Sequence, residues 1–91
     1  MHSPTGYYAL ITTARYITGP GGTETEDWSV TETYPVVSFQ SGESMIVNRA
    51  GEVRQAKEYT QEIREGYADK TDDGVRFEVA LDVTPHHTEG E

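Results

Sequence analysis

The most regular hydrophobic pattern in the chain lies between residues 75 and 84. Apolar and mostly polar residues alternate there, at the two-residue period of a strand that buries one face. The apolar positions are Val75, Phe77, Val79, Leu81 and Val83. The turn-forming sequence Asp-Asp-Gly precedes this run and a proline follows it, so both ends of the predicted strand have a chemical cause.

Two further strands are predicted in the first forty residues. Residues 7–18 are rich in Thr, Tyr and Ile, which suit a pleated sheet, and their apolar residues occupy both parities. This indicates either two covered faces or a bulge. The glycine-rich segment 19–22 and an acidic loop over 23–27 separate this strand from a second one, from Trp28 to about Phe39. Pro35 lies inside the second strand, and because proline donates no ladder hydrogen bond we expect an edge, a bulge or a break there.

A helix is predicted over residues 52–67. The segment is rich in Glu, Gln, Ala, Arg and Lys, and its apolar residues recur at spacings of three and four. This stripe consists of Ala50, Val53, Ala56, Tyr59 or Thr60, Ile63 and Tyr67. Asn48 would cap a helix that begins at Arg49. The preceding Ser-Gly-Glu-Ser at 41–44 is either a helix cap or the turn of a hairpin that leads into a short strand over 45–47.

These elements predict an α+β fold. A single amphipathic helix is expected to pack on a three- or four-stranded, mostly antiparallel sheet, in the order β-β-(β)-α-β. The helix should contribute Val53, Ala56, Ile63 and Tyr67 to the core, facing the strand over 75–83. The length of 91 residues fits one small domain over residues 1–91. Within it we expect an N-terminal arm over 1–6, a folded core over 7–84 and an acidic tail over 85–91.

Composition excludes several classes of protein. The chain has no cysteine, which rules out disulfides, thiolate chemistry and cysteine-bound zinc. No apolar run approaches the roughly 20 residues of a membrane helix, and the N-terminus lacks the pattern of a secretory signal. We therefore expect a cytoplasmic protein with no membrane partner. The net charge of −9 argues against direct binding of nucleic acid, because phosphate contacts need clustered Lys and Arg.

The negative charge is concentrated outside the predicted helix. Residues 1–40 contain four acids and one base, residues 41–67 five acids and four bases, and residues 68–91 seven acids and two bases. The acids are expected on the side of the sheet away from the helix, where their summed field attracts a basic partner. The predicted partner-binding carboxylates are Glu24, Glu26, Asp27, Glu32, Asp72, Asp73, Glu78 and Asp82. The alternative is that the acids only keep a small protein soluble.

Aromatic residues add a second candidate contact surface. The chain has six tyrosines and one tryptophan, types that are enriched where proteins bind one another. The predicted aromatic contacts are Tyr7, Tyr16, Trp28 and Tyr34. The alternative is a tyrosine-rich core whose hydroxyl groups reach the surface.

No catalytic residue, metal ligand or cofactor site is predicted. His86 and His87 are adjacent, and adjacent side chains on an extended tail point in opposite directions. Glu62 and Glu65 lie one helical turn apart, on what we expect to be the exposed face of the helix. The glycines of segment 19–22 are followed by acids rather than by a lysine and a helix, so a hairpin loop is expected there instead of a phosphate site.

The expected function is therefore that of a small acidic protein-binding module, and not of an enzyme. It would act as an inhibitor or regulator that engages the basic surface of a nucleic-acid-handling protein by charge mimicry, a role we expect in a viral or mobile-element protein. The alternative is an assembly component that forms a homo-oligomer or docks on a larger particle through strand edges and exposed tyrosines. A small ligand-binding protein or enzyme ranks third, since a pocket of about 300 Å³ is hard to form in so small a core.

Overall fold

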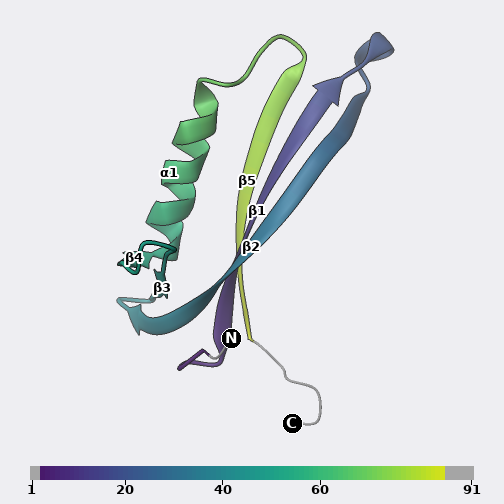
Figure 1. Ribbon diagram of the computed structural model, residues 1–91. Coiled ribbons are helices and arrows are strands. Elements are labelled where there is room, and N and C mark those ends of the chain that lie inside the picture. Colours follow the sequence, from purple (N-terminus) through teal and green to yellow (C-terminus); the bar gives the residue numbers. More distant parts are fainter. Residues whose placement is uncertain (1–2, 86–91) are drawn as a thin grey trace.

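The sheet has five antiparallel strands and carries one helix (Figure 1). The computed structural model describes residues 3–85. The strands are β1 (Tyr7–Thr18), β2 (Glu24–Gln40), β3 (Glu43–Val47), β4 (Val53–Gln55) and β5 (Val75–Pro85), and the helix is α1 (Ala56–Ala68). Their order across the sheet is β4-β3-β2-β1-β5. The predicted α+β class is confirmed, whereas the predicted number of three or four strands is wrong.

The central strand β1 pairs with β2 on one side and with β5 on the other. Its odd-numbered Ala9 and Ile11 are buried in the core beneath the helix, and its even-numbered Tyr8 and Ala14 are buried on the other face. The pairing with β2 shifts by one residue between Arg15 and Tyr16. The extra residue at this shift is Asp27 of β2, and β1 pairs with β5 without a shift. Burial on two faces, rather than a bulge, therefore explains the mixed pattern of β1.

Strand β2 is longer than predicted and it bends. The acidic residues 24–27, predicted to be a loop, extend the strand. Pro35 pairs with Tyr8, and the ladder to β3 begins only at the next residue, Val36. A register shift between Val36 and Ser38 then bends the strand. Pro35 therefore lies where no neighbouring strand requires its missing N–H.

The bend is held by the first described residues of the chain. Ser3 is buried, and its hydroxyl shares its one proton between the carbonyl of Val36, at 3.0 Å, and that of Tyr7, at 2.7 Å. The hydroxyl of Thr5 donates to the same Val36 carbonyl over 2.6 Å. Residues 3–6, which the sequence places in an arm, thus satisfy a buried acceptor next to the bulge.

The helix begins later than predicted, at Ala56 rather than near Arg49. Asn48 caps a turn instead of a helix, because its Oδ1 accepts from the backbone N–H groups of Ala50 and Glu52. Gly51 has a φ of +82°, which a helix does not allow. Val53 lies in β4 and is 54% exposed, so its predicted place in the core is also wrong.

The segment before β3 is the predicted hairpin turn and not a helix cap. Ser41 and Gly42 have φ values of 53° and 82°, and Gln40 pairs with Glu43. Two consecutive residues with positive φ are typical of the tight turn that matches the twist of a two-stranded hairpin.

The sheet curls around α1, which packs against β5 at one edge and against β3 and β4 at the other (Figure 1). The buried core is formed by Ala9, Ile11, Tyr34, Val36, Ile46, Ala56 and Val79. Tyr59, Ile63 and Tyr67 of the helix pack against it, together with Leu81 and Val83. Ala56, Ile63 and Tyr67 of the predicted stripe therefore lie in the core or against it, and Tyr67 stacks on Phe77 of β5.

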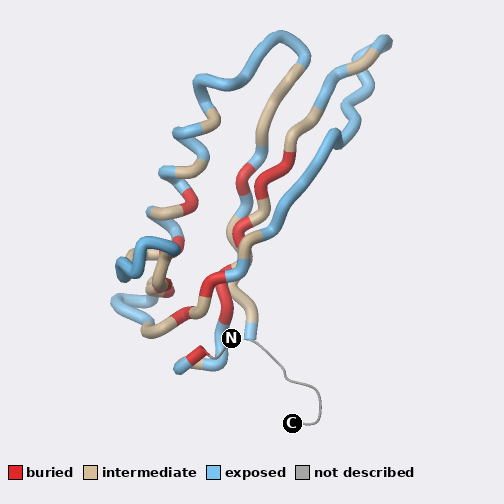
Figure 2. Tube along the Cα trace, viewed as in Figure 1, coloured by how far each residue is buried: buried red, intermediate tan, exposed pale blue. Residues whose placement is uncertain are grey.

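The molecule is elongated, with extents of 47 × 31 × 22 Å. The hairpin between β1 and β2 projects away from the core, and every residue from 20 to 31 is exposed (Figure 2). Among residues 3–85, no helix combines the length and the apolar character that crossing a bilayer requires.

Candidate protein-binding surface

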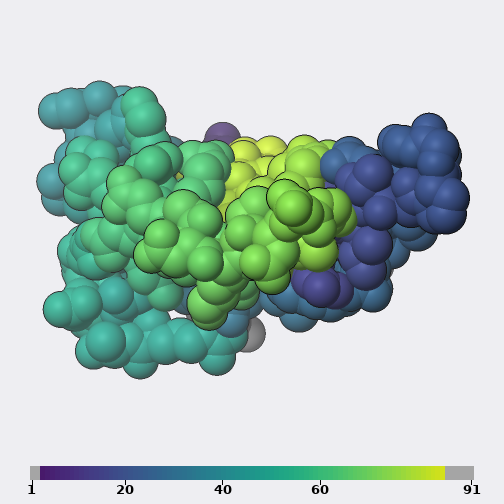
Figure 3. Space-filling model, turned by 90° about the horizontal axis from the view of Figure 1, so that it is seen from above, coloured from purple at the N-terminus to yellow at the C-terminus, as the bar shows by residue number. Residues whose placement is uncertain are grey.

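Two loops that are far apart in the sequence meet at one end of the molecule, which we call the acidic end. It comprises residues 15–28 of the β1–β2 hairpin and residues 68–78 around the turn from α1 to β5. The two segments are joined where the backbone N–H of Thr18 donates to the carbonyl of Gly74 over 2.7 Å. Viewed from above, the hairpin (blue) projects beside that turn (Figure 3).

Carboxylates outnumber cations at the acidic end. Its two segments contain seven acids and three bases, whereas residues 3–85 as a whole contain fourteen acids and seven bases. More than half of the net negative charge of the described chain therefore lies in 25 of its residues. The acids are Glu24, Glu26, Asp27, Asp69, Asp72, Asp73 and Glu78.

Two arginines neutralise three of these acids. Arg76 donates two hydrogen bonds to the carboxylate of Glu24, from Nε over 2.5 Å and from Nη2 over 2.9 Å. It also donates to Glu78 over 2.7 Å. The hydrogen bond from Arg76 holds the pKa of Glu24 below its ordinary value. Arg15 pairs with Asp27, the extra residue at the bulge of β2. These contacts fix the shape of the acidic end.

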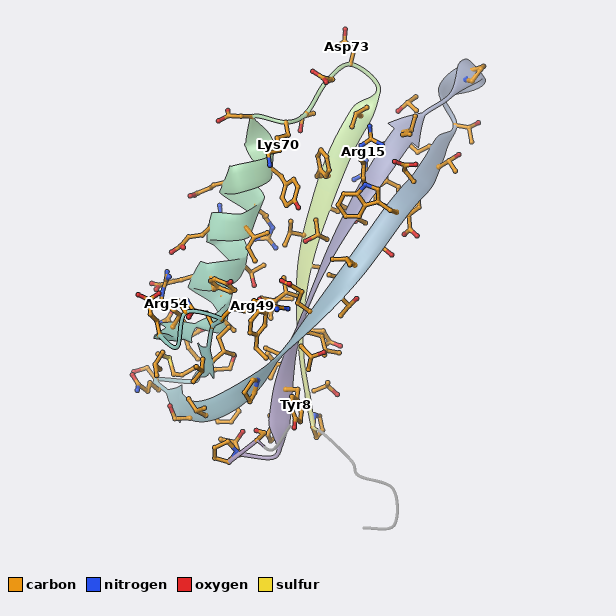
Figure 4. The ribbon with its side chains drawn as sticks, in the orientation of Figure 1. Tyr8, Arg15, Arg49, Arg54, Lys70 and Asp73 are labelled. Carbon is orange, nitrogen blue, oxygen red and sulfur yellow. The ribbon has the colours of Figure 1, made fainter. Side chains whose placement is uncertain are left out.

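Four carboxylates at this end have no cationic partner within ion-pair distance among residues 3–85: those of Glu26, Asp69, Asp72 and Asp73. Lys70 lies nearby, but its Nζ is 5.2 Å from the centre of the Tyr67 ring. Figure 4 shows Lys70 and Asp73 at this end of the molecule. The unpaired carboxylates make the acidic end a source of uncompensated negative field.

An aromatic strip formed by Trp28, Phe77 and Tyr67 lies beside these acids. The rings of Trp28 and Phe77 have centroids 6.0 Å apart, and those of Phe77 and Tyr67 stack at 4.7 Å. The strip lies on the helix side of the sheet. Because the helix packs on β5 and not on this part of β2, Trp28 remains 40% exposed and Val30 55% exposed.

The predicted carboxylates are only partly brought together. Glu24, Glu26 and Glu78 lie at the acidic end on the face away from the helix, and Asp72 and Asp73 lie in the adjoining turn. Asp27 also lies at this end, in its ion pair. Asp82 is on the same face as Glu78, nearer the other end, opposite Leu10.

Glu32 is placed on the helix side of the sheet, in a polar cluster with Tyr34, Tyr59 and Arg49. It accepts from the Tyr34 hydroxyl over 3.0 Å and from Arg49 over 3.0 Å, and the two tyrosine hydroxyls are 3.5 Å apart. Burial, and then the hydrogen bond with Tyr59, raises the pKa of Tyr34. Glu32 is therefore held by contacts within the protein, and it lies away from the acidic end.

The predicted aromatic residues divide in the same way. Trp28 and Tyr16 lie at the acidic end, and the guanidinium of Arg76 stacks 4.4 Å above the Tyr16 ring. Tyr7 lies at the other end against Phe39, with ring centroids 5.5 Å apart. Tyr34 is 3% exposed and belongs to the core, so its ring is not available to a partner.

Sequence reasoning missed the residues that organise this surface. Arg76 and Arg15 pair with predicted acids, and Phe77 and Tyr67 extend the aromatic strip from Trp28. The pairing of Glu24 with Arg76 depends on β5 lying next to β1, which a linear pattern does not contain. The signal that was present is parity, because even-numbered residues of β5 share a face.

The metal and catalytic candidates considered in the sequence were the two adjacent histidines and the pair Glu62 and Glu65. In residues 3–85 no group of three or more His, Asp and Glu side chains is arranged to hold a metal ion. His86 and His87, considered as ligands in the sequence, lie outside the described residues. Glu62 is exposed and pairs with Arg54, and Glu65 accepts a hydrogen bond from Gln61 over 3.3 Å.

Comparisons with known proteins find no relative of the chain. No protein-family model matches it, and neither the curated proteins nor the solved structures contain a match.

Proposed function

We propose that this protein is an acidic protein-binding module that uses the acidic end to engage a basic surface. Its partner is a nucleic-acid-handling protein, which the module inhibits or regulates by occupying the site that nucleic acid would fill. The observation that carries this proposal is the convergence of two distant loops into one end with seven acids, four of which have no cationic partner among residues 3–85. These carboxylates, Glu26 on the hairpin and three aspartates in the turn from α1 to β5, present their field to an approaching molecule with little self-screening.

The aromatic strip supports a protein as the partner. An exposed tryptophan next to charged groups supplies the apolar contact on which protein interfaces depend for affinity, while the surrounding charges set orientation and association rate. Trp28 and the unpaired Glu26 lie two residues apart in β2. The bulge at Asp27 places them on opposite faces of the sheet, so a partner that reaches around the β2 edge of the hairpin can contact both.

The proposal is tested first by capture and then with a purified partner. Immobilised protein is exposed to cell lysate at low and at high salt, and the captured proteins are identified. A captured protein is then purified and titrated with the chain alone and with duplex DNA present. We expect the affinity to fall with added salt and the DNA to compete with the chain for the same site.

A charge-matched pair of variants locates the contact. The triple variant Glu26→Gln, Asp72→Asn and Asp73→Asn neutralises unpaired acids at the acidic end. It should weaken binding about tenfold or more, if each exposed pair is worth about 0.5 kcal/mol.

The control removes the same number of charges elsewhere, at Glu43, Glu58 and Glu65, each changed to Gln. It should bind as the wild type does. Equal losses in the two variants, or an affinity that is indifferent to salt, would count against the proposal.

A further inference from the structure

The edge of β2 that faces away from β1 is unpaired over most of its length. Strand β3 joins β2 only from Val36 onward, so residues 24–35 have a neighbour on one side alone. Most native edge strands are shortened, bulged or interrupted by proline to prevent unwanted pairing. Here the bulge at Asp27 and the proline at position 35 lie at the two ends, and the segment 28–34 between them is a regular strand.

The direction of the backbone groups along this edge follows from three recorded hydrogen bonds. Thr18 N–H donates to Gly74 next to β5, and Gly19 N–H donates to Thr23 next to β2. The carbonyl of Val79 points away from β1, because it accepts from Arg64 over 3.0 Å. Since backbone groups alternate in direction along an antiparallel strand, even-numbered residues of β1 bond β5 and odd-numbered ones bond β2.

The same alternation fixes which residues of β2 face outward. Trp28 pairs with Arg15 and Val30 pairs with Thr13, so both direct their backbone groups toward β1. Ser29, Thr31 and Thr33 therefore present their N–H and C=O groups to the open edge. No backbone hydrogen bond to these three residues from another part of the described chain is recorded.

Charge selects what this edge can accept. Strand β2 carries four acids and no base. Three of them pair with arginines from other parts of the chain, and Glu26 has no cationic partner among residues 3–85. A second copy of the chain would align acids with acids, which is unfavourable across paired strands. A basic strand would be complemented, with its apolar side chains against Trp28 and Val30 on the helix side.

We propose that an extended basic segment of the partner protein binds along residues 28–34 as an added strand of the sheet. This inference rests on the proposed function and names how the partner is held. The outward N–H and C=O groups of Ser29, Thr31 and Thr33 bond the segment's backbone, and a basic side chain of the segment reaches the unpaired Glu26. Beyond Thr33 the edge opens into a hollow of about 370 Å³ that can receive one side chain of the segment. The hollow is lined by Thr33, Tyr34, Pro35, Val47, Asn48 and Arg49.

The test uses a capped synthetic peptide of alternating lysine and valine as the probe, with a glutamate–valine peptide as its control. Trp28 is the only tryptophan in the chain, and its fluorescence reports binding directly beside the edge. Amide hydrogen exchange gives the decisive pattern. In the free protein the N–H groups of Ser29, Thr31 and Thr33 should exchange fast and those of Trp28 and Val30 slowly. The lysine–valine peptide should slow the first set about tenfold or more.

A matched pair of variants separates strand addition from attraction by charge. Thr31→Pro removes an outward N–H, and Thr31→Val retains it. Both lose the hydrogen bond of 2.8 Å between the hydroxyls of Thr31 and Thr12. The valine variant should bind the peptide as the wild type does. The proline variant should lose this binding, whereas any salt-dependent binding at other parts of the protein should stay unchanged.

The outcomes distinguish a failure of strand addition from a failure of the proposed function. Salt-dependent binding of the peptide without protection of the three outward amides would overturn strand addition and leave the acidic end as the binding site. Protection of those amides by the glutamate peptide as well as by the lysine peptide would contradict the charge selection. If the proline variant fails to fold, protection of the three outward amides in the wild-type protein still tests the proposal.

Discussion

Arg76 and Glu24 lie 52 residues apart in the sequence and form a two-bonded fork on the face of the sheet away from the helix. They are brought together because β1 pairs with β2 on one side and with β5 on the other, so that Arg76, opposite Tyr16, reaches diagonally across β1 to Glu24, opposite Thr18. The fork joins the hairpin to β5 across β1. It therefore links the two loops of the acidic end at their bases.

The ionisation of Glu24 should make the stability of the protein depend on pH in the acidic range. The hydrogen bond from Arg76 lowers the pKa of Glu24 below its ordinary value of 4.5. The folded state thus favours the ionised carboxyl, and its contribution is present above the unfolded pKa and lost as the pH falls through the folded pKa. Denaturant melts over acidic pH should show a shallower loss of stability for Glu24→Gln than for the wild type. NMR titration of Arg76→Gln should show the pKa of Glu24 returning toward 4.5.

The two hydroxyls that bond the Val36 carbonyl should stabilise the bend in β2. Removing both, in Ser3→Ala with Thr5→Ala, leaves a buried acceptor without its side-chain donors. We expect a loss of about 1–3 kcal/mol in the free energy of unfolding, and a smaller loss for either single change, since one donor then remains. Urea melts of the three variants measure this. Single losses that add up to the double loss would mean that the two hydroxyls do not share one acceptor.

The corrected start of the helix is tested by two apolar residues that precede it. Ile46 of β3 is fully buried, and Val53 of β4 is 54% exposed. Ile46→Ala should cost about 2–5 kcal/mol and Val53→Ala less than about 0.5 kcal/mol. A large loss of unfolding free energy for Val53→Ala in a denaturant melt would indicate that Val53 lies in the core, as the sequence pattern predicts.

Two glycines should respond to alanine in opposite directions. Gly66 lies inside α1 with open space around its Cα, so Gly66→Ala should stabilise the protein by about 0.5–1 kcal/mol. Gly42 has a φ of +82° in the hairpin turn, and alanine there should destabilise it by about 1–2 kcal/mol. Thermal melts of the two variants should therefore move to opposite sides of the wild type.

Tyr34 should make the protein less stable in alkali. Burial and the hydrogen bond with Tyr59 raise the pKa of Tyr34 from its ordinary value of 10.0. The folded state holds this proton more tightly than the unfolded chain, so stability declines as the pH rises above the unfolded value. Tyr34→Phe removes the ionisable group and should lose less stability between neutral and alkaline pH. An equally steep decline in the variant would assign the effect to another group.

Local sequence patterns correctly predicted the elements whose structure is determined by their own residues. The alternation over 75–83 and the composition of 7–18 are sufficient to identify β5 and β1, because each strand has neighbours that cover its apolar face. The hairpin turn at Ser41 and Gly42 was one of two readings that its chemistry allowed. The class of the fold follows from these elements.

The remaining differences depend on contacts between distant residues. Ala50 and Val53 continue the spacing of the helix stripe, and only the pairing of 53–55 with β3 makes them part of a turn and a strand. Similarly, Glu32 and Tyr34 follow the pattern of surface strand residues until Tyr59 and Arg49 close over them. No local pattern encodes the curl of the sheet that brings these residues together.

That curl gives α1 a mechanical role. A single helix fastens both margins of the sheet, β5 on one side and β3 with β4 on the other. Detaching it would release the two margins at the same time, so neither can fray on its own while the helix is docked. The molecule should accordingly open in one concerted event, and the part left to adjust its shape around a bound molecule is the tip of the hairpin over residues 19–23, beyond the contacts of Glu24 and Thr18 with β5 and its turn.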